Sequence, residues 1–439
     1  MNYLKSNLGW ILVIFIALEP VAIWWGIMPL GARFGSLTAF FTSLGQLTGL
    51  VGMALFAESL ILSARLKFFD RHLSGLNRVY INHHKIGAVA FILLLFHPLL
   101  LTWRYASVSL PSALTFWSLG NNFAVDLGKY SLAAMIVLLV LTFFVKLPYD
   151  FWKNTHKFLG LAFFLGGLHS FFVVSDISSS QLLRTYMLSL SILGVIAYVY
   201  HTLLGRWLVR RYLYVVDEVK KLGQLVTEVS LSPLHPGAKV TYRPGQFAFL
   251  NFSDWPQGVE QHPFSFTSAP GDTSIKFVIK NLGDYTVNIP QLPKGAIAKI
   301  EGPFGKFSFT EMTAKNQIWV AGGIGITPFV SMARSLAVKK DFGDYHIDLF
   351  YTARQNDEMV LLDELSDIAQ AQPNFRLFAH TSADNGRITA RMVEEKSGQL
   401  TGKDILICGP VPMMRTLKEQ FLEMGVSRRR IHSEEFSLQ

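Results

Sequence analysis

The sequence predicts three successive parts: a membrane domain of six helices, an antiparallel β-barrel, and an α/β domain with a parallel sheet. Half of the 439 residues are hydrophobic, and before residue 212 they collect in long runs. From there on, short alternating segments are separated by Pro and Gly, which is typical of a small barrel. From about residue 316, strands alternate with helices, which indicates a parallel sheet. A chain this long and this apolar is expected to form two or three domains.

Six apolar runs each approach the length of roughly 20 residues that spans a hydrocarbon core. They cover residues 8–30, 36–62, 84–103, 127–147, 157–175 and 183–205. No cleavage site of small residues accompanies the first run, so we expect it to be a retained span and not a secretory signal.

Basic residues beside these runs lie mainly on one side of the expected bundle. Eleven lie in or beside the loops after the second and fourth runs, or just after the sixth: Arg65, Lys67, Arg71, Arg78, Lys85, Lys146, Lys153, Lys157, Arg206, Arg210 and Arg211. The opposite loops hold four: Arg33, Arg104, Lys129 and Arg184. The positive-inside rule therefore places both termini in the cytoplasm. The formal net charge of +9 thus reflects membrane topology, and we expect no nucleic-acid partner.

Four histidines lie in or beside the apolar runs, where an ionisable side chain is costly and is by default interpreted as functional. His83 and His97 are 14 residues apart, which puts them about 21 Å apart along a helix and about 40° apart around it. His156 and His169 are 13 apart, about 140° out of phase, but the glycines at 166–167 could let their helix deform. The expected topology puts His83 and His156 at the inner level and the other two at the outer level. Two stacked b-type haems need such pairs of imidazoles.

Two alternatives qualify this interpretation. A single histidine in a span is more often packed and hydrogen-bonded than bound to a metal, and it is the pairing of four at near-equal spacing that favours haem. His84 could replace His83 as the inner ligand. We prefer His83 because both segments then carry a glycine four residues later, Gly87 and Gly160.

Two carboxylates and a cysteine are the other unusual residues. Glu19 and Glu58 lie within spans, where proton handling is possible but a hydrogen bond to a neighbour inside the bundle is the favoured interpretation. Cys408 is the only cysteine, so the chain cannot build a disulfide framework, a CxxC zinc site or a cysteine-ligated iron–sulfur cluster.

The second half alternates regularly enough to place its elements. We expect barrel strands at residues 212–219, 223–231, 247–252, 275–279 and 296–301. In the α/β part we expect strands at 318–321, 347–351, 375–379 and 405–408, and helices at 327–339, 359–370, 389–395 and 411–424.

Two barrel segments suit a flavin. The segment 262–267 reads His-Pro-Phe-Ser-Phe-Thr, in which an aromatic face and small hydroxyls could contact the ring: Phe264, Ser265 and Thr267. The segment 279–286 supplies a lysine, a glycine and a threonine that open a short helix: Lys280, Gly283 and Thr286. Backbone N–H groups and the helix dipole there suit a pyrophosphate.

A glycine-rich loop in the α/β part suits a dinucleotide. Residues 321–328 read Ala-Gly-Gly-Ile-Gly-Ile-Thr-Pro and lie between a strand and a helix, where glycines let a ligand approach the backbone. Cys408-Gly409-Pro410 ends a later strand of the same sheet, at the edge where ligands of α/β proteins bind. With no obvious base nearby in the sequence, Cys408 is expected to line a nicotinamide or to pack, and not to act as a nucleophile.

The motifs, in this order, resemble those of the ferric reductase and NADPH oxidase superfamily over nearly the whole chain. The resemblance implies a ferric reductase-like di-haem domain at 1–210, an FAD-binding barrel at 211–312 and an NAD(P)-binding domain at 313–439. It implies metal ligation by the four histidines: His83, His97, His156 and His169. It implies FAD contacts from His262, Pro263, Phe264, Ser265, Thr267, Lys280, Gly283 and Thr286. It implies nucleotide contacts from Gly322, Gly323, Gly325, Thr327, Pro328, Arg354, Cys408, Gly409 and Pro410.

Hydride transfer is assigned, by the same resemblance, to Ser265, Cys408 and the near-terminal aromatic Phe436, which would stack on the flavin. Three residues follow Phe436, whereas many oxidases stop at the aromatic. Ferredoxin reductases usually carry Arg before the flavin segment, whereas this chain has His262-Pro263, closer to oxidases and ferric reductases. Eukaryotic oxidases have a further histidine four residues after the outer ligand, and this chain has Leu101 there.

The resemblance implies that cytosolic NADPH or NADH reduces FAD, that electrons then cross two haem b groups, and that an acceptor outside a bacterial-type inner membrane receives them. A ferric chelate is the favoured acceptor, because of Leu101 and because no calcium-binding or assembly extension is visible. The alternatives are an oxidase that reduces O2 to superoxide, and a membrane flavoprotein that feeds electrons to a periplasmic redox partner.

Overall fold

The computed structural model of the chain describes residues 2–147, 149–253, 261–338 and 343–435, and Phe436 lies outside them. The chain divides into two compact units, Met1–Val209 and Arg210–Gln439. The first is helical, and the second combines a nearly closed antiparallel barrel with a parallel sheet flanked by helices. This confirms the predicted fold class.

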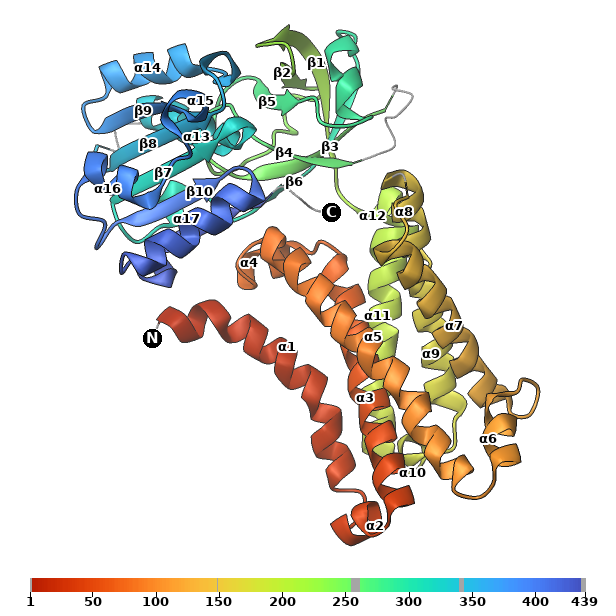
Figure 1. The fold of residues 1–439 in the computed structure, drawn as a ribbon. Helices are drawn as coiled ribbons and strands as arrows, with labels where there is room; N and C mark the ends of the chain where they lie inside the picture. Colours follow the sequence, from red (N-terminus) through yellow and green to blue (C-terminus); the bar gives the residue numbers. More distant parts are fainter. Residues whose placement is uncertain (1, 148, 254–260, 339–342, 436–439) are drawn as a thin grey trace. The chain divides into compact units, whose positions relative to one another are not determined.

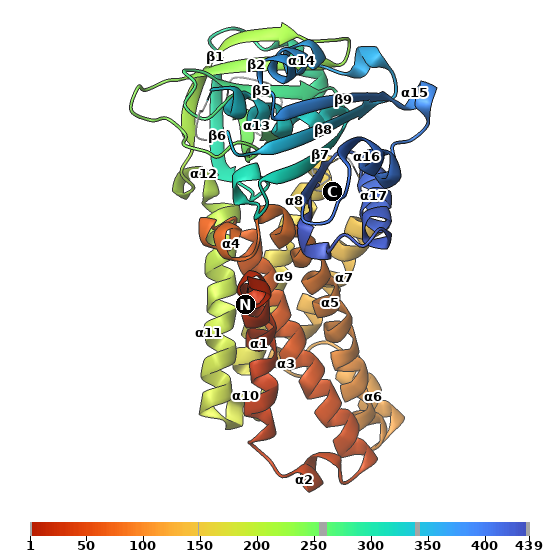
Figure 2. The ribbon, with the colours of Figure 1, turned by 90° about the vertical axis from the view of Figure 1, so that its left-hand side faces the viewer.

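The helical unit consists of long helices that lie side by side (Figures 1 and 2). The long ones are α1 (Asn2–Trp25), α3 (Leu37–Ser63), α5 (Leu76–Ala106), α7 (Phe123–Phe143), α9 (Leu159–Phe172) and α11 (Gln181–Tyr198), which continues into a π-helical turn, η1 (Val199–Leu203). Short helices lie at the ends of the bundle: α2 (Leu30–Phe34), α6 (Leu110–Trp117) and α10 (Asp176–Ser179) at one end, and α4 (Lys67–His72), α8 (Tyr149–Lys157) and α12 (Gly205–Leu208) at the other. Ser36, Asn122 and Ser180 cap α3, α7 and α11 by accepting a backbone N–H, as residues of these types commonly do.

Five helices in the described part of the chain have the length and apolar composition to cross a membrane. They are Leu8–Trp25, Leu37–Ser63, Leu76–Ala106, Phe123–Phe143 and Gln181–Leu203. The predicted fifth span, 157–175, corresponds to α9, which has only 14 residues because the helical path is interrupted at Phe158 between α8 and α9. A single helix over residues 157–175 is therefore not observed, and the count of six spans stays a prediction.

The break at Phe158 also corrects the expected position of the distortion between His156 and His169. The amide of Phe158 donates to Thr155 and the amide of Leu161 to the Phe158 carbonyl, both i to i+3 bonds, so the chain tightens there. The glycines at 166–167 remain inside α9. One of them, Gly166, faces α7, where an added Cβ would lie 3.1 Å from Ser131 Oγ.

A buried arginine joins the segments at one end of the bundle. Arg33 forms an ion pair with Asp176 (2.9 Å) and donates a hydrogen bond to the Trp24 carbonyl (2.7 Å), with its guanidinium 3.5 Å from the centre of the Trp24 ring. Paired in this way, the arginine can be buried without an uncompensated charge. One of the four cations counted for the outer loops is therefore neutralised locally.

Glu58 differs from its favoured interpretation. Its side chain is buried in α3, and neither carboxyl oxygen has a hydrogen-bond partner within the part of the chain that the structure describes. The expected hydrogen bond to a neighbour is not formed there.

The barrel in the second unit has six strands in the order β4-β3-β6-β1-β2-β5, all antiparallel neighbours. They are β1 (Tyr212–Lys221), β2 (Val226–Pro233), β3 (Phe247–Phe252), β4 (His262–Ser265), β5 (Ile275–Lys280) and β6 (Ile297–Phe304). A bridge between Phe266 and Phe277 links the end of β4 towards β5 and nearly closes the barrel. The interior is aromatic and aliphatic, so each strand turns its apolar residues inward.

The parallel sheet has the order β11-β10-β7-β8-β9. Its strands are β7 (Asn316–Gly322), β8 (His346–Ala353), β9 (Phe375–Thr381), β10 (Asp404–Cys408) and β11 (Ile431–Glu434). Helices α13 (Thr327–Val338) and α14 (Leu362–Ala371) pack on one face, and α16 (Ala390–Ser397) and α17 (Val411–Glu423) on the other (Figure 1). All the carboxyl ends of these strands meet at one edge, as parallel pairing requires.

Asp404 ties the opposite edge of this sheet together. Its buried carboxylate accepts hydrogen bonds from the Ala314 amide (2.6 Å) and the Thr313 hydroxyl (3.1 Å), and His432 lies 3.4 Å away. Burial alone would raise the pKa of this carboxyl, but hydrogen bonds from His432, Ala314 and Thr313 outweigh it and lower the pKa below its usual value. A carboxyl with a lowered folded-state pKa stabilises the fold above its unfolded pKa, and this is lost as the pH falls through the folded value.

Replacing Asp404 by Asn is expected to lower the free energy of unfolding by about 1.5–3 kcal/mol at neutral pH, the range for hydrogen bonds to charged groups. The deficit should begin to shrink below about pH 4, where the unfolded carboxyl starts to be protonated, and should vanish only below the lowered pKa of the folded wild-type carboxyl. Thermal unfolding of the full-length protein in detergent over a pH series measures this. The control is Asp367→Asn, at an exposed carboxylate on α14. A deficit that is independent of pH would contradict this account.

Candidate redox site and family assignment

The structure brings the four histidines together in two pairs. The ring centroids of His83 (α5) and His156 (α8) lie 6.3 Å apart, and those of His97 (α5) and His169 (α9) lie 6.4 Å apart. The sequence predicted these two pairings; its assignment of one pair to the inner side of the membrane and the other to the outer side stays a prediction, and the names inner and outer pair are used below in that sense. The break at Phe158 lets both pairs form.

Three of the four imidazoles are oriented by hydrogen bonds from Nδ1–H to a main-chain carbonyl. His97 donates to Gly45 (2.7 Å), His169 to Ala124 (2.7 Å) and His83 to Ser59 (2.9 Å). Donation from Nδ1 leaves Nε2 as the ring nitrogen with a lone pair, and metal-binding histidines commonly make such a bond. Each of the three rings therefore presents a potential ligand atom.

Glycines on the neighbouring helices leave room for the outer pair. A Cβ at Gly49 on α3 would lie 2.6 Å from His97 Nδ1, and a Cβ at Gly128 on α7 would lie 3.0 Å from His169 Nδ1. Side chains at these two positions would displace the rings. The sequence did not point to either glycine.

The inner pair involves His83 and not His84. The His84 ring lies beside Phe143, 6.4 Å between centroids, whereas the His83 ring is the one that faces His156. His156 stacks on Trp152 at 5.5 Å, and its buried Nδ1 has no hydrogen-bond partner within the described residues.

These residues fit b-type haem. Two imidazoles bound to opposite sides of one metal ion, with metal–nitrogen bonds of about 2.0–2.1 Å as known for zinc, would place their ring centres roughly 6.3 Å apart. Both pairs have this separation. No group of three or more His, Cys, Asp or Glu side chains within the described residues could hold a metal ion, but a porphyrin needs only two axial ligands from the protein.

A cavity extends from the outer pair towards the end of the bundle. His97 and His169 line it, together with Leu101 and the charged residues Arg104 and Lys129. Lys129 is held by Asp126 at 2.8 Å, whereas Arg104 is exposed.

The flavin segment forms β4 and the turn after it. Ser265 and Thr267 are buried, and neither hydroxyl has a hydrogen-bond partner within the described residues. A buried hydroxyl without a partner is unfavourable, so a ligand with polar edges would suit them. Phe264 and His262 are partly exposed, and the His262 ring stacks on Tyr285 with centroids 4.0 Å apart.

The pyrophosphate segment has the expected short helix, a 3₁₀-helix η2 (Thr286–Gln291), which follows Lys280 at the end of β5. Thr286 Oγ1 accepts hydrogen bonds from the amides of Leu282 (2.8 Å) and Gly283 (3.1 Å). Two backbone donors near the expected phosphate position are therefore already paired with this hydroxyl.

The glycine-rich loop packs against the turn after β10. A Cβ at Gly325 would lie 2.6 Å from the Cys408 carbonyl carbon and 2.7 Å from Gly409 Cα. A Cβ at Gly322 would lie 2.9 Å from Pro410 Cδ. Both turns follow adjacent strands, β7 and β10, at the carboxyl edge, where α/β proteins bind ligands. Gly323, at φ +52°, has open space beside it.

The remaining predicted residues lie at the same edge. Thr327 and Pro328 begin α13, and Arg354 directly follows β8, the neighbour of β7. Cys408 ends β10 and is fully buried; burial raises the pKa of its thiol well above the usual range, and Glu434 adds to this effect. A protonated thiol is not a nucleophile, which agrees with a packing or lining role.

Sequence reasoning missed the partners of the histidines and a set of polar contacts around Arg334 between the barrel and the parallel sheet. Neither has a local sequence signal. Main-chain carbonyls carry no residue-type signature, and Arg334 has the appearance of an ordinary polar position on a helix.

Family models match most of the chain. Residues 48–167 match the ferric reductase like transmembrane component, residues 218–320 an FAD-binding domain, and residues 319–419 an oxidoreductase NAD-binding domain.

Similar proteins include a flavohemoprotein of Rhodopirellula baltica, 25% identical over 262 residues, covering 53% of this chain and 62% of that protein. The toluate 1,2-dioxygenase electron transfer component of Pseudomonas putida is 26% identical over 237 residues, covering 52% of this chain and 68% of that protein. The chain thus spans less than two thirds of the flavohemoprotein's length. Among solved structures, flavohemoglobin from Malassezia yamatoensis has a TM-score of 0.53 at 17% identity and covers 92% of this chain and 99% of its own, a likeness of fold alone.

The helical unit thus contains a ferric reductase-like membrane domain, and the second unit is an FAD- and NAD-binding reductase module. This combination supports electron transfer driven by NAD(P)H in a multi-pass membrane protein. By its order of domains, a ferric reductase like transmembrane component followed by FAD-binding and oxidoreductase NAD-binding domains, the chain has a ferric reductase/NADPH oxidase-like architecture.

Proposed function

We propose that this protein carries electrons from cytosolic NADPH or NADH, by way of FAD and two b-type haems, to a ferric chelate on the opposite side of a cell membrane. The observation that carries this proposal is that four imidazoles form two pairs, His83 with His156 and His97 with His169, at two levels of the bundle. The predicted domains, 1–210, 211–312 and 313–439, would hold the haems, FAD and the nicotinamide nucleotide respectively.

The chain's own residues bind and orient the cofactors. His83 with His156, and His97 with His169, would hold the two haems, with three of the rings fixed by carbonyl groups. When bound, FAD takes a hydride from the nicotinamide and haem iron takes single electrons.

In the reductase module, Ser265 and Thr267 would receive the polar edge of the flavin ring, with Phe264 and His262-Pro263 beside it. Lys280, Gly283 and Thr286 would receive its phosphates. The nicotinamide nucleotide would lie over the turns of Gly322–Pro328 and Cys408–Pro410, with Arg354 at its other end. The Cys408 thiol, buried and protonated, would line this site, and Phe436 would shield the flavin.

Two features support a ferric chelate over oxygen as the acceptor. Leu101 lines the cavity beside the outer histidines, so the wall at this position offers no proton donor to bound oxygen. Arg104, at the same cavity, carries a positive charge that suits an anionic chelate.

Sidedness tests the proposal. In sealed right-side-out vesicles, NADPH loaded inside should reduce a membrane-impermeant ferric chelate outside, and NADPH added outside should be inert. Inverted vesicles should oxidise added NADPH, because the positive-inside rule places the reductase module in the cytoplasm. Oxidation of external NADPH by intact right-side-out vesicles would contradict the proposed topology.

The same vesicles distinguish the acceptors. Electron flow to oxygen that reduces cytochrome c and is abolished by superoxide dismutase would instead identify an oxidase. Flow that appears only with a periplasmic extract would identify a redox partner protein.

A further inference from the structure

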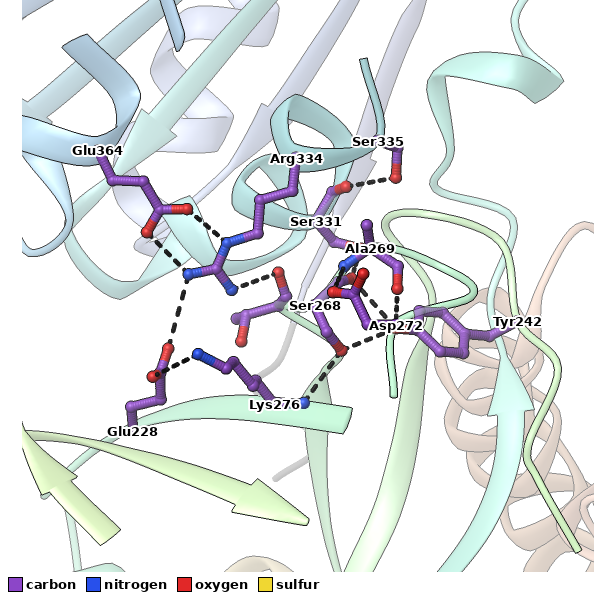
Figure 3. Close-up of polar contacts among 11 residues, drawn as sticks. Glu228, Tyr242, Ser268, Ala269, Asp272, Lys276, Ser331, Arg334, Ser335 and Glu364 are labelled. Carbon is purple, nitrogen blue, oxygen red and sulfur yellow. Dashed lines mark hydrogen bonds and ion pairs between the residues drawn. The ribbon is translucent and has the colours of Figure 1, made fainter. Parts of the chain in front are cut away.

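A network of charges connects the barrel to the parallel sheet inside the second unit. Arg334, on α13, lies at the centre of this network, and its side chain is only 14% exposed. Its Nε and Nη2 donate to the two carboxylate oxygens of Glu364 on α14, at 2.6 and 2.8 Å. Figure 3 shows the guanidinium between Glu364 and Glu228, which lies on β2 at 3.6 Å. The planar guanidinium satisfies this fork geometry, and an ammonium group does not.

The third arm of Arg334 reaches the flavin segment. Nη1 donates to the carbonyl oxygen of Thr267 at 2.9 Å. One helical turn earlier on α13, the Ser331 hydroxyl donates to the carbonyl of the next residue, Ser268, at 2.7 Å. Tyr242 supports this turn from the barrel side, with its hydroxyl 2.7 Å from Ser268 Oγ (Figure 3). The last carbonyl of the flavin segment, that of Thr267, and the next one along the chain, that of Ser268, are thus held by one helix of the nucleotide domain.

The same helix begins at the predicted nucleotide loop. Thr327 is the first residue of α13, directly after the glycine-rich turn, and Arg334 lies seven residues later, about 10 Å along the helix. Helix α14, which carries Glu364, is the first long helix after Arg354. The helices that follow the glycine-rich loop and Arg354 therefore meet at Arg334, which also holds the backbone at Thr267.

We infer that Arg334 is a positioning residue for hydride transfer, which fixes the glycine-rich loop and the segment after Arg354 relative to the flavin segment. This inference rests on the proposed placement of FAD and nicotinamide. Hydride transfer needs the two reacting atoms close together and aligned, and a misplacement of about 1 Å can lower the rate about a hundredfold. Arg334 contacts the main-chain carbonyl of Thr267 and not its hydroxyl, which is the group expected to contact the flavin. Arg334 therefore acts through the backbone at Thr267 and through α14.

The test compares Arg334→Gln with Arg376→Gln in the purified full-length protein. Arg376 forms an ion pair with Asp348 at 2.7 Å in the same domain, away from the flavin segment, and is the matched control. Anaerobic rapid mixing with NADPH and with NADH follows flavin reduction, the nicotinamide–flavin charge-transfer absorption and the isotope effect with 4-deuterated nucleotide. These signals report the hydride step and do not depend on the haems or on an acceptor.

We expect Arg334→Gln to slow flavin reduction about tenfold or more, with a weaker charge-transfer band and with the nucleotide concentration for half-maximal rate changed much less. Arg334→Lys keeps the charge but not the fork, and should recover part of the rate. Arg376→Gln should match the wild type. Glu364→Gln leaves the Arg334–Thr267 hydrogen bond in place and should shift the same signals in the same direction by less. If Arg334→Gln loses FAD, Glu364→Gln takes its place as the test variant.

Flavin reduction and charge-transfer absorption that are unchanged in Arg334→Lys and Glu364→Gln, or a loss in Arg334→Gln no larger than in Arg376→Gln, would overturn the inference. A wild-type flavin that is reduced normally in a protein whose haems stay oxidised would contradict the proposed electron path and leave the role of Arg334 intact. A wild-type flavin that neither nucleotide reduces would overturn both.

Discussion

Replacing His97 or His169 by alanine is expected to remove one haem per chain and to lower reduction of the external acceptor at least about a hundredfold, since even losing a partner of a metal ligand typically costs 10–100-fold. Flavin reduction by NADPH should continue, because these residues lie in the helical unit and not in the reductase module. The haem content, the reduced absorption spectrum and the rate of flavin reduction measure the three expectations separately.

The neighbouring residues His83 and His84 supply a matched comparison for this prediction. His83→Ala should remove the inner haem, whereas His84→Ala should retain both, because the His84 ring lies beside Phe143. A wild-type protein without a Soret band would end the haem assignment. Two haems in His97→Ala would show that this histidine is not a ligand.

Gly325→Ala is expected to have the second-largest effect. The added Cβ would lie 2.6 Å from a backbone carbonyl carbon and 2.7 Å from another backbone atom, neither of which can move as a side chain does. Overpacking of this kind costs about 1–3 kcal/mol, so nucleotide affinity or flavin reduction should fall about tenfold or more. Steady-state oxidation of NADPH and NADH with a soluble acceptor such as ferricyanide measures it.

Gly223→Ala is the control for Gly325→Ala. It lies in the barrel, has no positive φ and would meet no atom within 4 Å. A Gly325→Ala protein with normal kinetics for both nucleotides would show that the turn after β7 has more room than the structure indicates.

The periodicity of apolar residues and the positions of Gly and Pro between the elements were enough to predict most of the second unit. Strand β3 was expected at 247–252 and is found there, and α13 was expected at 327–339 and is found at Thr327–Val338. These elements have local causes: alternating apolar residues, or a helix that begins after a glycine turn. Strand β11 (Ile431–Glu434) was not expected, since it is four residues long and exists through pairing with β10.

The membrane unit shows where sequence reasoning ends. The pairing of histidines followed from spacing and topology, but the break at Phe158 did not, because Phe158 is an ordinary apolar residue and the nearby Gly160 lies inside α9. The acceptors of the histidine N–H groups are backbone atoms of α3 and α7, so they depend on how helices pack. The role of Phe436 lies outside the described residues and stays a prediction.

The break at Phe158 affects how the two histidine-bearing segments, α5 on one side and α8 with α9 on the other, tolerate insertions. In α5, His83 and His97 share one continuous helix, so inserting a single residue between them would rotate one ring by about 100° relative to the other. On the opposite wall, His156 and His169 belong to separate helices joined at one non-helical position. An insertion there would change a junction and leave the phase of each helix intact. Natural relatives can therefore differ in length at residue 158 and still form both histidine pairs. An insertion or deletion between residues 83 and 97 would separate the members of the pairs.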